Sequence, residues 1–179
     1  MLAADTTSIA LGSIFAEFEK KDMQTLFEWI EKMSIVVESG VQSVGPPATY
    51  ALVWEFGNAR QTKKGPKTVK SKNPDGKTVW LSIQAPHGWI AVHEEKIWDI
   101  IFQELSKVKL DPSGSEDNVK EELVKAYERI AAKALELLQS TVPVDSGELY
   151  DSLQIVSPDD SILKEVSSLA NDIVGTLNL

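Results

Sequence analysis

The sequence predicts an α+β fold: a small, mainly antiparallel sheet that carries a long hairpin arm and is flanked by about four helices. Two observations predict it. Apolar residues recur at three- and four-residue spacing in several segments, which is typical of amphipathic helices. Large apolar residues alternate in two other runs, which is typical of strands. We treat residues 1–179 as a single domain, since a chain of this length buries a sizeable core.

Four segments carry the helical pattern, and turn-forming or capping residues bound them. The first begins at Met23 and closes at Gly40. Residues 1–20 are expected to form a loose N-terminal extension, and 111–115 an internal linker. The later helices are predicted from about Glu94 to Val108, from about Glu116 to Ser140 and from Ser157 onward, with a short helix running into a strand over Leu149–Val156.

Two alternating runs predict the strands of the sheet. In Tyr50–Gly57 large apolar residues stand at every second position, and the same pattern occurs in Thr78–Ile83. Trp89–Val92 is a candidate third strand. The segment between the first two strands is long for a compact domain, and its Asn73-Pro74-Asp75-Gly76 sequence is typical of a turn. We therefore expect residues 58–77 to form a hairpin arm.

The expected arm is strongly basic within an acidic chain. Residues 60–77 carry seven bases against one acid, a net charge of +6, while the rest of the chain carries 11 bases against 26 acids, a net charge of −15. So sharp a separation of charge indicates a contact surface. The bases of the arm are Arg60, Lys63, Lys64, Lys67, Lys70, Lys72 and Lys77.

Three interpretations of the arm are open. It is a solvated loop, or it docks on an acidic partner such as another copy of this chain, or it touches the backbone of a nucleic acid. Its lysines would neutralise several phosphates, but the arm lacks the interleaved aromatic residues that stack on single strands. Self-association needs no further component, because both signs of charge are on one chain.

The composition narrows the class of protein. The chain has no cysteine, which excludes disulfides, thiolate metal sites and cysteine nucleophiles. No apolar run approaches the roughly 20 residues that span a bilayer, and the start of the chain lacks the basic residues of a secretory signal. We expect a soluble protein that is made in the cytoplasm and has no membrane partner.

No residue pattern indicates an enzyme, and we expect no catalytic residues, no cofactor and no metal. His87 and His93 could point the same way from a strand, but a third metal ligand at a diagnostic spacing is missing. Asp145-Ser146-Gly147 resembles the D-[ST]-G motif of aspartic proteases. Because it follows a long helix and a proline, a helix N-cap at Asp145 explains it better, with Glu148 closing a capping box.

Four of the five tryptophans gather around the predicted sheet, at positions 54, 80, 89 and 98. We expect them to build a core of large side chains. Trp80 is out of phase with Val79 and Leu81. A second interpretation therefore places Trp80 on the opposite face of the sheet, against another helix or a neighbouring subunit.

Two phrases of the sequence resemble a known family. Tyr50-Ala51 followed by Glu55, Phe56 and Gly57 is similar to the "YA…(V)EFG" stretch of the tail-completion, head–tail connection (neck) proteins of long-tailed bacteriophages. The segment from Pro143 to Leu153 is similar to the family's second phrase, "P-V-D-T-G-x-L-x-x-S-I", with Ser146 in place of the threonine. The two phrases occur here in the reverse of the family's order. The second phrase is matched at Pro143, Val144, Asp145, Gly147, Leu149 and Ser152.

The resemblance implies a non-enzymatic, structural role in a virion. Members of this family are small α+β domains that assemble as rings at the neck or the top of the tail. For this chain it implies a homo-oligomeric ring, a hexamer or a dodecamer, with portal, adaptor and tail proteins as partners and non-specific contact with double-stranded DNA in the lumen. The alternative is a nucleic-acid-binding accessory protein that uses residues 60–77.

Overall fold

A computed structural model describes residues 8–45, 69–72, 78–81, 90–111, 115–142 and 147–178. Within these residues the chain is an α+β protein, as the sequence predicts. Helices make most of the body, and the strands form three antiparallel pairs. The described strands thus form three separate two-stranded sheets and do not join into one.

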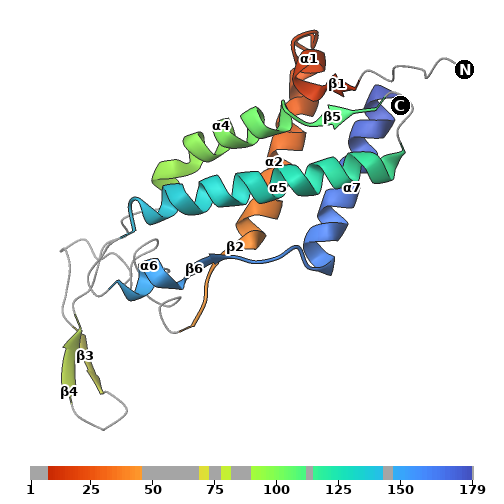
Figure 1. The fold of residues 1–179 in the computed structure, drawn as a ribbon. Coiled ribbons are helices and arrows are strands. Elements are labelled where there is room, and N and C mark those ends of the chain that lie inside the picture. The colour runs from red at the N-terminus through yellow and green to blue at the C-terminus, as the bar shows by residue number, and fades with distance from the viewer. Residues whose placement is uncertain are drawn as a thin grey trace, which may run out of the picture.

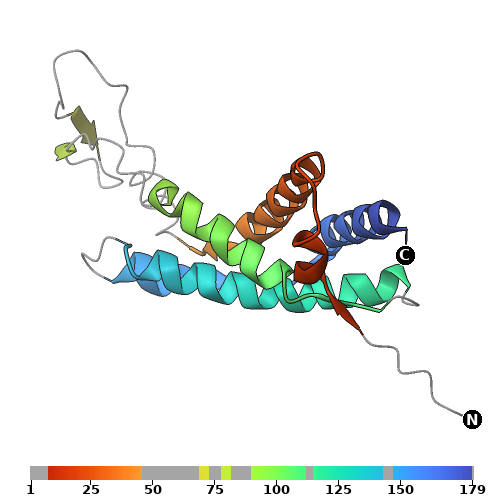
Figure 2. The ribbon, with the colours of Figure 1, turned by 90° about the horizontal axis from the view of Figure 1, so that it is seen from above.

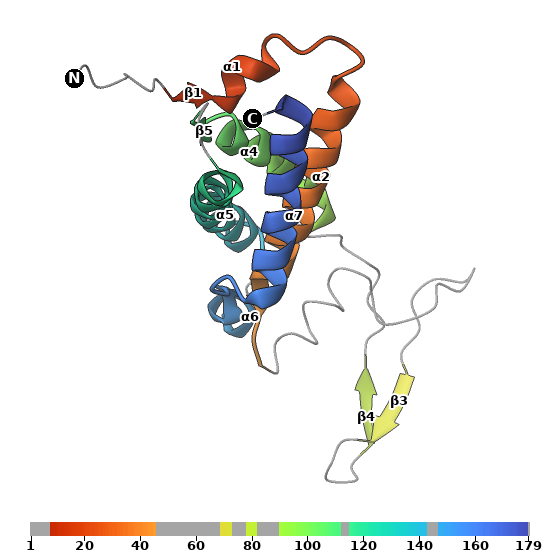
Figure 3. The same ribbon diagram turned by 90° about the vertical axis from the view of Figure 1, so that its right-hand side faces the viewer.

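Four long helices form the body, and α5 (Glu116–Gln139) lies at its centre. α2 (Met23–Gly40), α4 (Glu94–Leu105) and α7 (Asp160–Leu177) all pack against α5. α4 and α5 run nearly side by side, and α2 and α7 cross them (Figures 1 and 2). Figure 3 looks almost along α5 and shows the other three helices beside it. The four helices predicted from the periodic apolar patterns are confirmed.

The core lies between these helices and holds the apolar stripes that predicted them. In α7 the whole predicted stripe is buried, from Ile162 to Ile173. The Asp159 carboxylate accepts the backbone N–H of Ile162 at 2.9 Å, which fixes the start of this helix. Large side chains that are almost wholly buried include Leu11, Trp29, Met33, Ile101, Leu105, Leu110, Leu123, Tyr127, Ile130, Leu169 and Ile173.

The N-terminal segment belongs to the body from residue 9 onward. β1 (Ile9–Ala10) pairs with β5 (Lys109–Leu110), and α1 (Leu11–Phe15) follows at once. Leu11 and Phe15 are buried, and the Phe15 ring stacks on Phe102 with 5.8 Å between the ring centroids. The expectation of a loose extension over residues 1–20 is therefore wrong for this segment. A five-residue helix with two core side chains leaves too short a pattern to recognise.

A second strand pair closes the other end of the body. β2 (Val41–Ser43) continues from α2 and pairs with β6 (Leu153–Ile155). β6 follows α6 (Glu148–Ser152), so the short helix that runs into a strand is confirmed.

The start of α6 differs from the predicted cap. The helix begins at Glu148, and Gly147 is its N-cap residue, with a φ of 82°. Glycine suits this position, because a side chain strains the backbone at positive φ. Glu148 is thus the first helical residue, and the prediction of the N-cap at Asp145 is wrong, because the cap lies two residues later. Residues 143–146, and residues 112–114 of the predicted linker, lie outside the described residues.

The described part of the predicted arm, residues 69–72, is one strand of an antiparallel pair. β3 (Val69–Lys72) pairs with β4 (Thr78–Leu81), so that position 70 lies opposite position 80. β4 falls within the second predicted strand, and its partner starts inside the basic insert. The first predicted strand, Tyr50–Gly57, lies outside the described residues. The pair projects away from the helical body (Figures 1 and 3).

The candidate strand over Trp89–Val92 is wrong where the structure describes it. Ala91–His93 form a short 3-10 helix, η1, that runs directly into α4. The backbone N–H of His93 donates to the carbonyl oxygen of Ile90 at 2.9 Å, and this bond closes the turn. Backbone groups that are bonded within a turn cannot also pair with a strand.

Gly40 lets the end of α2 pack directly on Tyr127 of α5. A Cβ atom at position 40 would lie 2.0 Å from the Tyr127 hydroxyl oxygen and 2.7 Å from its Cζ. The same hydroxyl donates to the carbonyl oxygen of Val156 at 2.8 Å, and the Val156 N–H donates to the Gly40 carbonyl oxygen at 2.7 Å. Three segments that are distant in the sequence therefore meet at this glycine.

Gly40→Ala is expected to lower the free energy of unfolding by about 2–4 kcal/mol, because the added methyl group displaces Tyr127 and breaks its hydrogen bond. Urea unfolding measures the change. Gly175→Ala is the matched control, since a Cβ there meets nothing within 4 Å, and it should be neutral or raise stability by up to about 1 kcal/mol. Equal effects of the two substitutions would contradict the packing argument.

Candidate functional site

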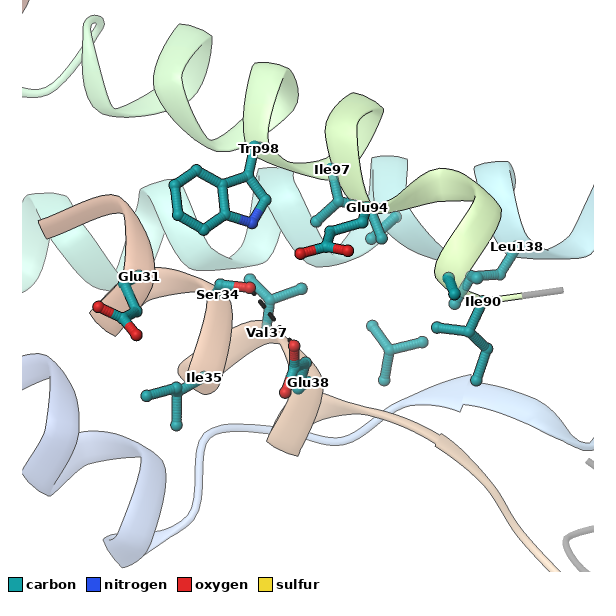
Figure 4. Close-up of a pocket in the computed structure, with 13 residues that line it drawn as sticks. Glu31, Ser34, Ile35, Val37, Glu38, Ile90, Glu94, Ile97, Trp98 and Leu138 are labelled. Atoms are coloured by element: carbon teal, nitrogen blue, oxygen red, sulfur yellow. Dashed lines mark hydrogen bonds between the residues drawn. The ribbon is translucent and has the colours of Figure 1, made fainter. Parts of the chain in front are cut away.

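A groove of about 610 Å³ opens between α2, α4 and α5 (Figure 4). Its volume falls within the roughly 300–1,000 Å³ of typical binding sites. Figure 4 shows α2 and α4 facing each other across it. The side chains that line it are Glu31, Ser34, Ile35, Val37, Glu38, Val41, Ile90, Ala91, Glu94, Ile97, Trp98, Ala134 and Leu138.

The groove presents apolar surface to its opening. Ile35 on the α2 side is 50% exposed, and Ile90 before η1 is 40% exposed. Trp98 of α4 is half-buried and packs against the main core. Ala134 and Leu138 of α5 lie deeper and are buried. A ligand seated here would cover apolar side chains that the single chain leaves partly in water.

Three carboxylates ring this apolar surface. Glu31 and Glu38 come from α2 and Glu94 from the first turn of α4, and all three are exposed. The Ser34 hydroxyl donates to Glu38 at 3.5 Å. Among the described residues that line the groove, none is a lysine or an arginine. The groove therefore favours a ligand that carries positive charge beside apolar groups.

A second polar cluster, around Glu104 of α4, is buried and differs in kind. Glu104 stands in register with the apolar stripe of its helix and is only 1% exposed, although its side chain carries a charge. Arg129 Nε donates to its Oε2 at 2.8 Å, while the amines of Lys133 and Lys107 donate to its Oε1 at 2.7 and 2.6 Å. Burial alone would raise the pKa of Glu104, but these hydrogen bonds outweigh it and lower that pKa to about 2.

The geometry of the Glu104 cluster suits structure better than catalysis. Both carboxylate oxygens already accept charged donors, two of which come from α5. A general acid or base needs a pKa near the working pH, whereas this carboxylate stays ionised far below it. The cluster therefore ties α4 to α5.

His93 is buried where η1 meets α4. Its Nε2 lies 2.6 Å from the Thr141 hydroxyl oxygen, just beyond the end of α5. Its Nδ1 is buried with no hydrogen-bond partner among the described residues. Burial, and then the charge of Lys96, lower the pKa of His93, so the neutral ring is favoured. His87 lies outside the described residues, and within them no group of three or more metal-ligating side chains occurs.

The structure describes only part of the predicted site. Lys70 and Lys72 lie on β3, whereas the other five bases of the arm lie outside the described residues. Gly147 caps α6, and Leu149 is buried in a small cluster with Leu138, Val142 and Leu153. The remaining motif residues, Glu55, Phe56, Gly57, Pro143, Asp145 and Ser146, are also outside the described part.

Sequence reasoning missed the groove and the Glu104 cluster. In the sequence, the acidic residues of the groove look like those of any solvent-exposed helix face. Only the placement of α2 beside α4 brings them together. Glu104 did leave a signal, because it lies three residues after Ile101 and four before Val108, on the apolar stripe. A lone acid on such a stripe indicates a buried ion pair.

Comparisons with protein-family models, with curated proteins and with solved structures find no match for this chain. Over the part of the chain that the structure describes, none of the helices is both long enough and apolar enough to cross a membrane.

Glu104→Gln is expected to lower the free energy of unfolding by about 2–3 kcal/mol at neutral pH. The pKa of Glu104 is lower in the folded chain than the ordinary glutamate value of 4.5, so its stabilising effect is present above that value and is lost as pH falls toward about 2. Urea unfolding between about pH 7 and pH 2 should show the deficit shrinking. Glu165→Gln, at an exposed carboxylate of α7, should have almost no effect; a constant deficit for Glu104→Gln would refute the assignment.

Because of His93, stability is expected to fall as the solution becomes mildly acidic. Its pKa is lower in the folded chain than the ordinary histidine value of 6.5, so the unfolded chain takes up the proton first and stability is lost as pH falls below that value. His93→Gln should flatten this dependence when unfolding is compared at about pH 7.5 and pH 5.5. A pH dependence that His93→Gln leaves unchanged would contradict this assignment.

Proposed function

We propose that this chain is a structural virion protein of a tailed bacteriophage, a neck or tail-completion component that assembles as a ring. In this role it joins portal or adaptor proteins to the tail, as a head–tail connector or a tail terminator. It is made in the host cytoplasm and resides at the neck or the top of the tail.

The class of protein rests on the two family-like phrases. Glu55, Phe56 and Gly57 end the first, and Pro143 to Leu153 make up the second. Leu149 of the second phrase is buried in the body, and Gly147 sets the start of α6. Both observations suit a structural role for this phrase, and the described residues supply no competing catalytic arrangement.

The proposal that copies assemble into a ring rests on the distribution of charge and apolar surface. The body carries an acidic groove with a partly exposed apolar lining, and the same chain carries a segment of net charge +6. Opposite charges on separate parts of one chain favour contacts between copies, and head-to-tail contacts can close into a ring. The separation of charge between the acidic body and the basic segment carries the proposal of a ring, whichever surface of the body receives the segment.

One observation favours the alternative, a nucleic-acid-binding accessory protein. β3 places Lys70 and Lys72 on a strand pair that projects from the body, where a duplex could reach it. Phosphate contacts by such lysines need no base recognition and weaken steeply with salt.

The mass of the purified protein in solution separates the two functions. A ring is expected, with a mass that is a fixed multiple of the 19.7 kDa chain, formed without DNA or on mixing with connector or tail proteins. The measurement is sedimentation velocity at low and high salt, with and without double-stranded DNA. A monomer that binds DNA with a steep salt dependence, lost when the lysines of residues 60–77 are neutralised, would refute the structural role.

A further inference from the structure

We propose that the groove between α2, α4 and α5 is the receptor for the basic segment 60–77 of a neighbouring copy of this chain. The inference rests on the proposed assembly of copies into a ring, and it names the two surfaces that meet.

The first argument is charge. Glu31, Glu38 and Glu94 ring the groove, and no basic residue is among the described side chains that line it. The segment 60–77 carries seven bases and one acid. The rest of the chain carries a net charge of −15, so the body of a neighbouring copy attracts the basic segment. The groove adds a concave shape, which concentrates the field of its carboxylates.

The second argument is the apolar surface. Half-exposed Ile35 and the partly exposed Ile90 leave apolar area at the mouth of the groove, beside half-buried Trp98. Lysine side chains have long apolar stems that cover such a surface while their charged ends reach nearby carboxylates. An indole face also attracts a cation that comes within reach of it. A lysine-rich segment therefore suits both the lining and the rim.

The third argument concerns which copy supplies the segment. In the single chain, β3 and β4 pair with each other and project away from the helical body (Figures 1 and 3). Among the described residues of the single chain, none from β3 or β4 lines the groove. Because groove and segment are different surfaces, each copy can receive the segment of one neighbour and offer its own segment to another, and this head-to-tail arrangement closes a ring.

Exchange of charge between the two surfaces tests the inference. The groove variant combines Glu31→Lys, Glu38→Lys and Glu94→Lys. The segment variant combines Lys63→Glu, Lys64→Glu, Lys67→Glu, Lys70→Glu and Lys72→Glu, which change the net charge of residues 60–77 from +6 to −4. Each variant alone is expected to associate at least about 100-fold more weakly than the unsubstituted chain, because like charges then face each other. An equimolar mixture of the two should restore the assembly with alternating subunits, measured by sedimentation velocity.

Two further proteins control for folding and for net charge. Glu17→Lys, Glu136→Lys and Glu165→Lys change the same number of charges at exposed positions outside the groove, and this variant should assemble normally. Glu31→Gln, Glu38→Gln and Glu94→Gln remove the groove charges without reversing them. This milder variant should weaken association less and reduce its dependence on salt.

The outcomes separate this inference from the proposed function. If the groove variant forms the same ring as the unsubstituted chain, the groove is not the receptor, while the ring and the structural role stand. If both variants fail alone and their mixture also fails, the two surfaces do not meet and the inference is overturned. If the unsubstituted chain stays monomeric with and without DNA and with connector and tail proteins, the proposed function itself is wrong.

Discussion

The contact between Gly40 and Tyr127 is the constraint on which the rest of the body depends. It sets how closely the end of α2 approaches α5, and the Tyr127 hydroxyl fixes Val156, at the start of the connection to α7. Burial, followed by the charges of Asp159 and Glu128, raises the pKa of Tyr127, so the hydroxyl keeps the proton that it donates. α2 in turn supplies one wall of the groove, so this contact positions Glu38 and Val41.

The Glu104 cluster does for α4 what Gly40 does for α2. Apolar packing alone lets one helix slide along another, whereas a buried carboxylate that accepts three charged donors accepts one alignment. Arg129 and Lys133 lie on α5, four residues apart, so the cluster fixes α4 along the axis of α5. The two walls of the groove are thus held independently on the same central helix.

The long helices could be predicted because each has an apolar stripe of several turns, and Gly40 marked an end of α2 correctly. The shortest segments at α1 and η1 could not, since Leu11 and Phe15 or Ala91 to His93 leave no repeating pattern. The cap at Gly147 depends on a positive φ, which the sequence does not show, and Asp145 two residues earlier is the more typical N-cap residue. The candidate site is a different problem. Glu31 and Glu94 are distant in the sequence, and local patterns do not reveal which helices become neighbours.

The pairing of β2 with β6 has a mechanical consequence. Val41 lies opposite Ile155, next to α2, and Ser43 lies opposite Leu153, where β2 leaves the body. A pull at Ser43 that acts across the two strands therefore loads the outer residue pair first and peels the ribbon one pair at a time. Peeling requires less force than shearing all the bonds together. The ribbon thus acts as a compliant link, and tension on the segment beyond it is absorbed there before it reaches the packed glycine at the end of α2.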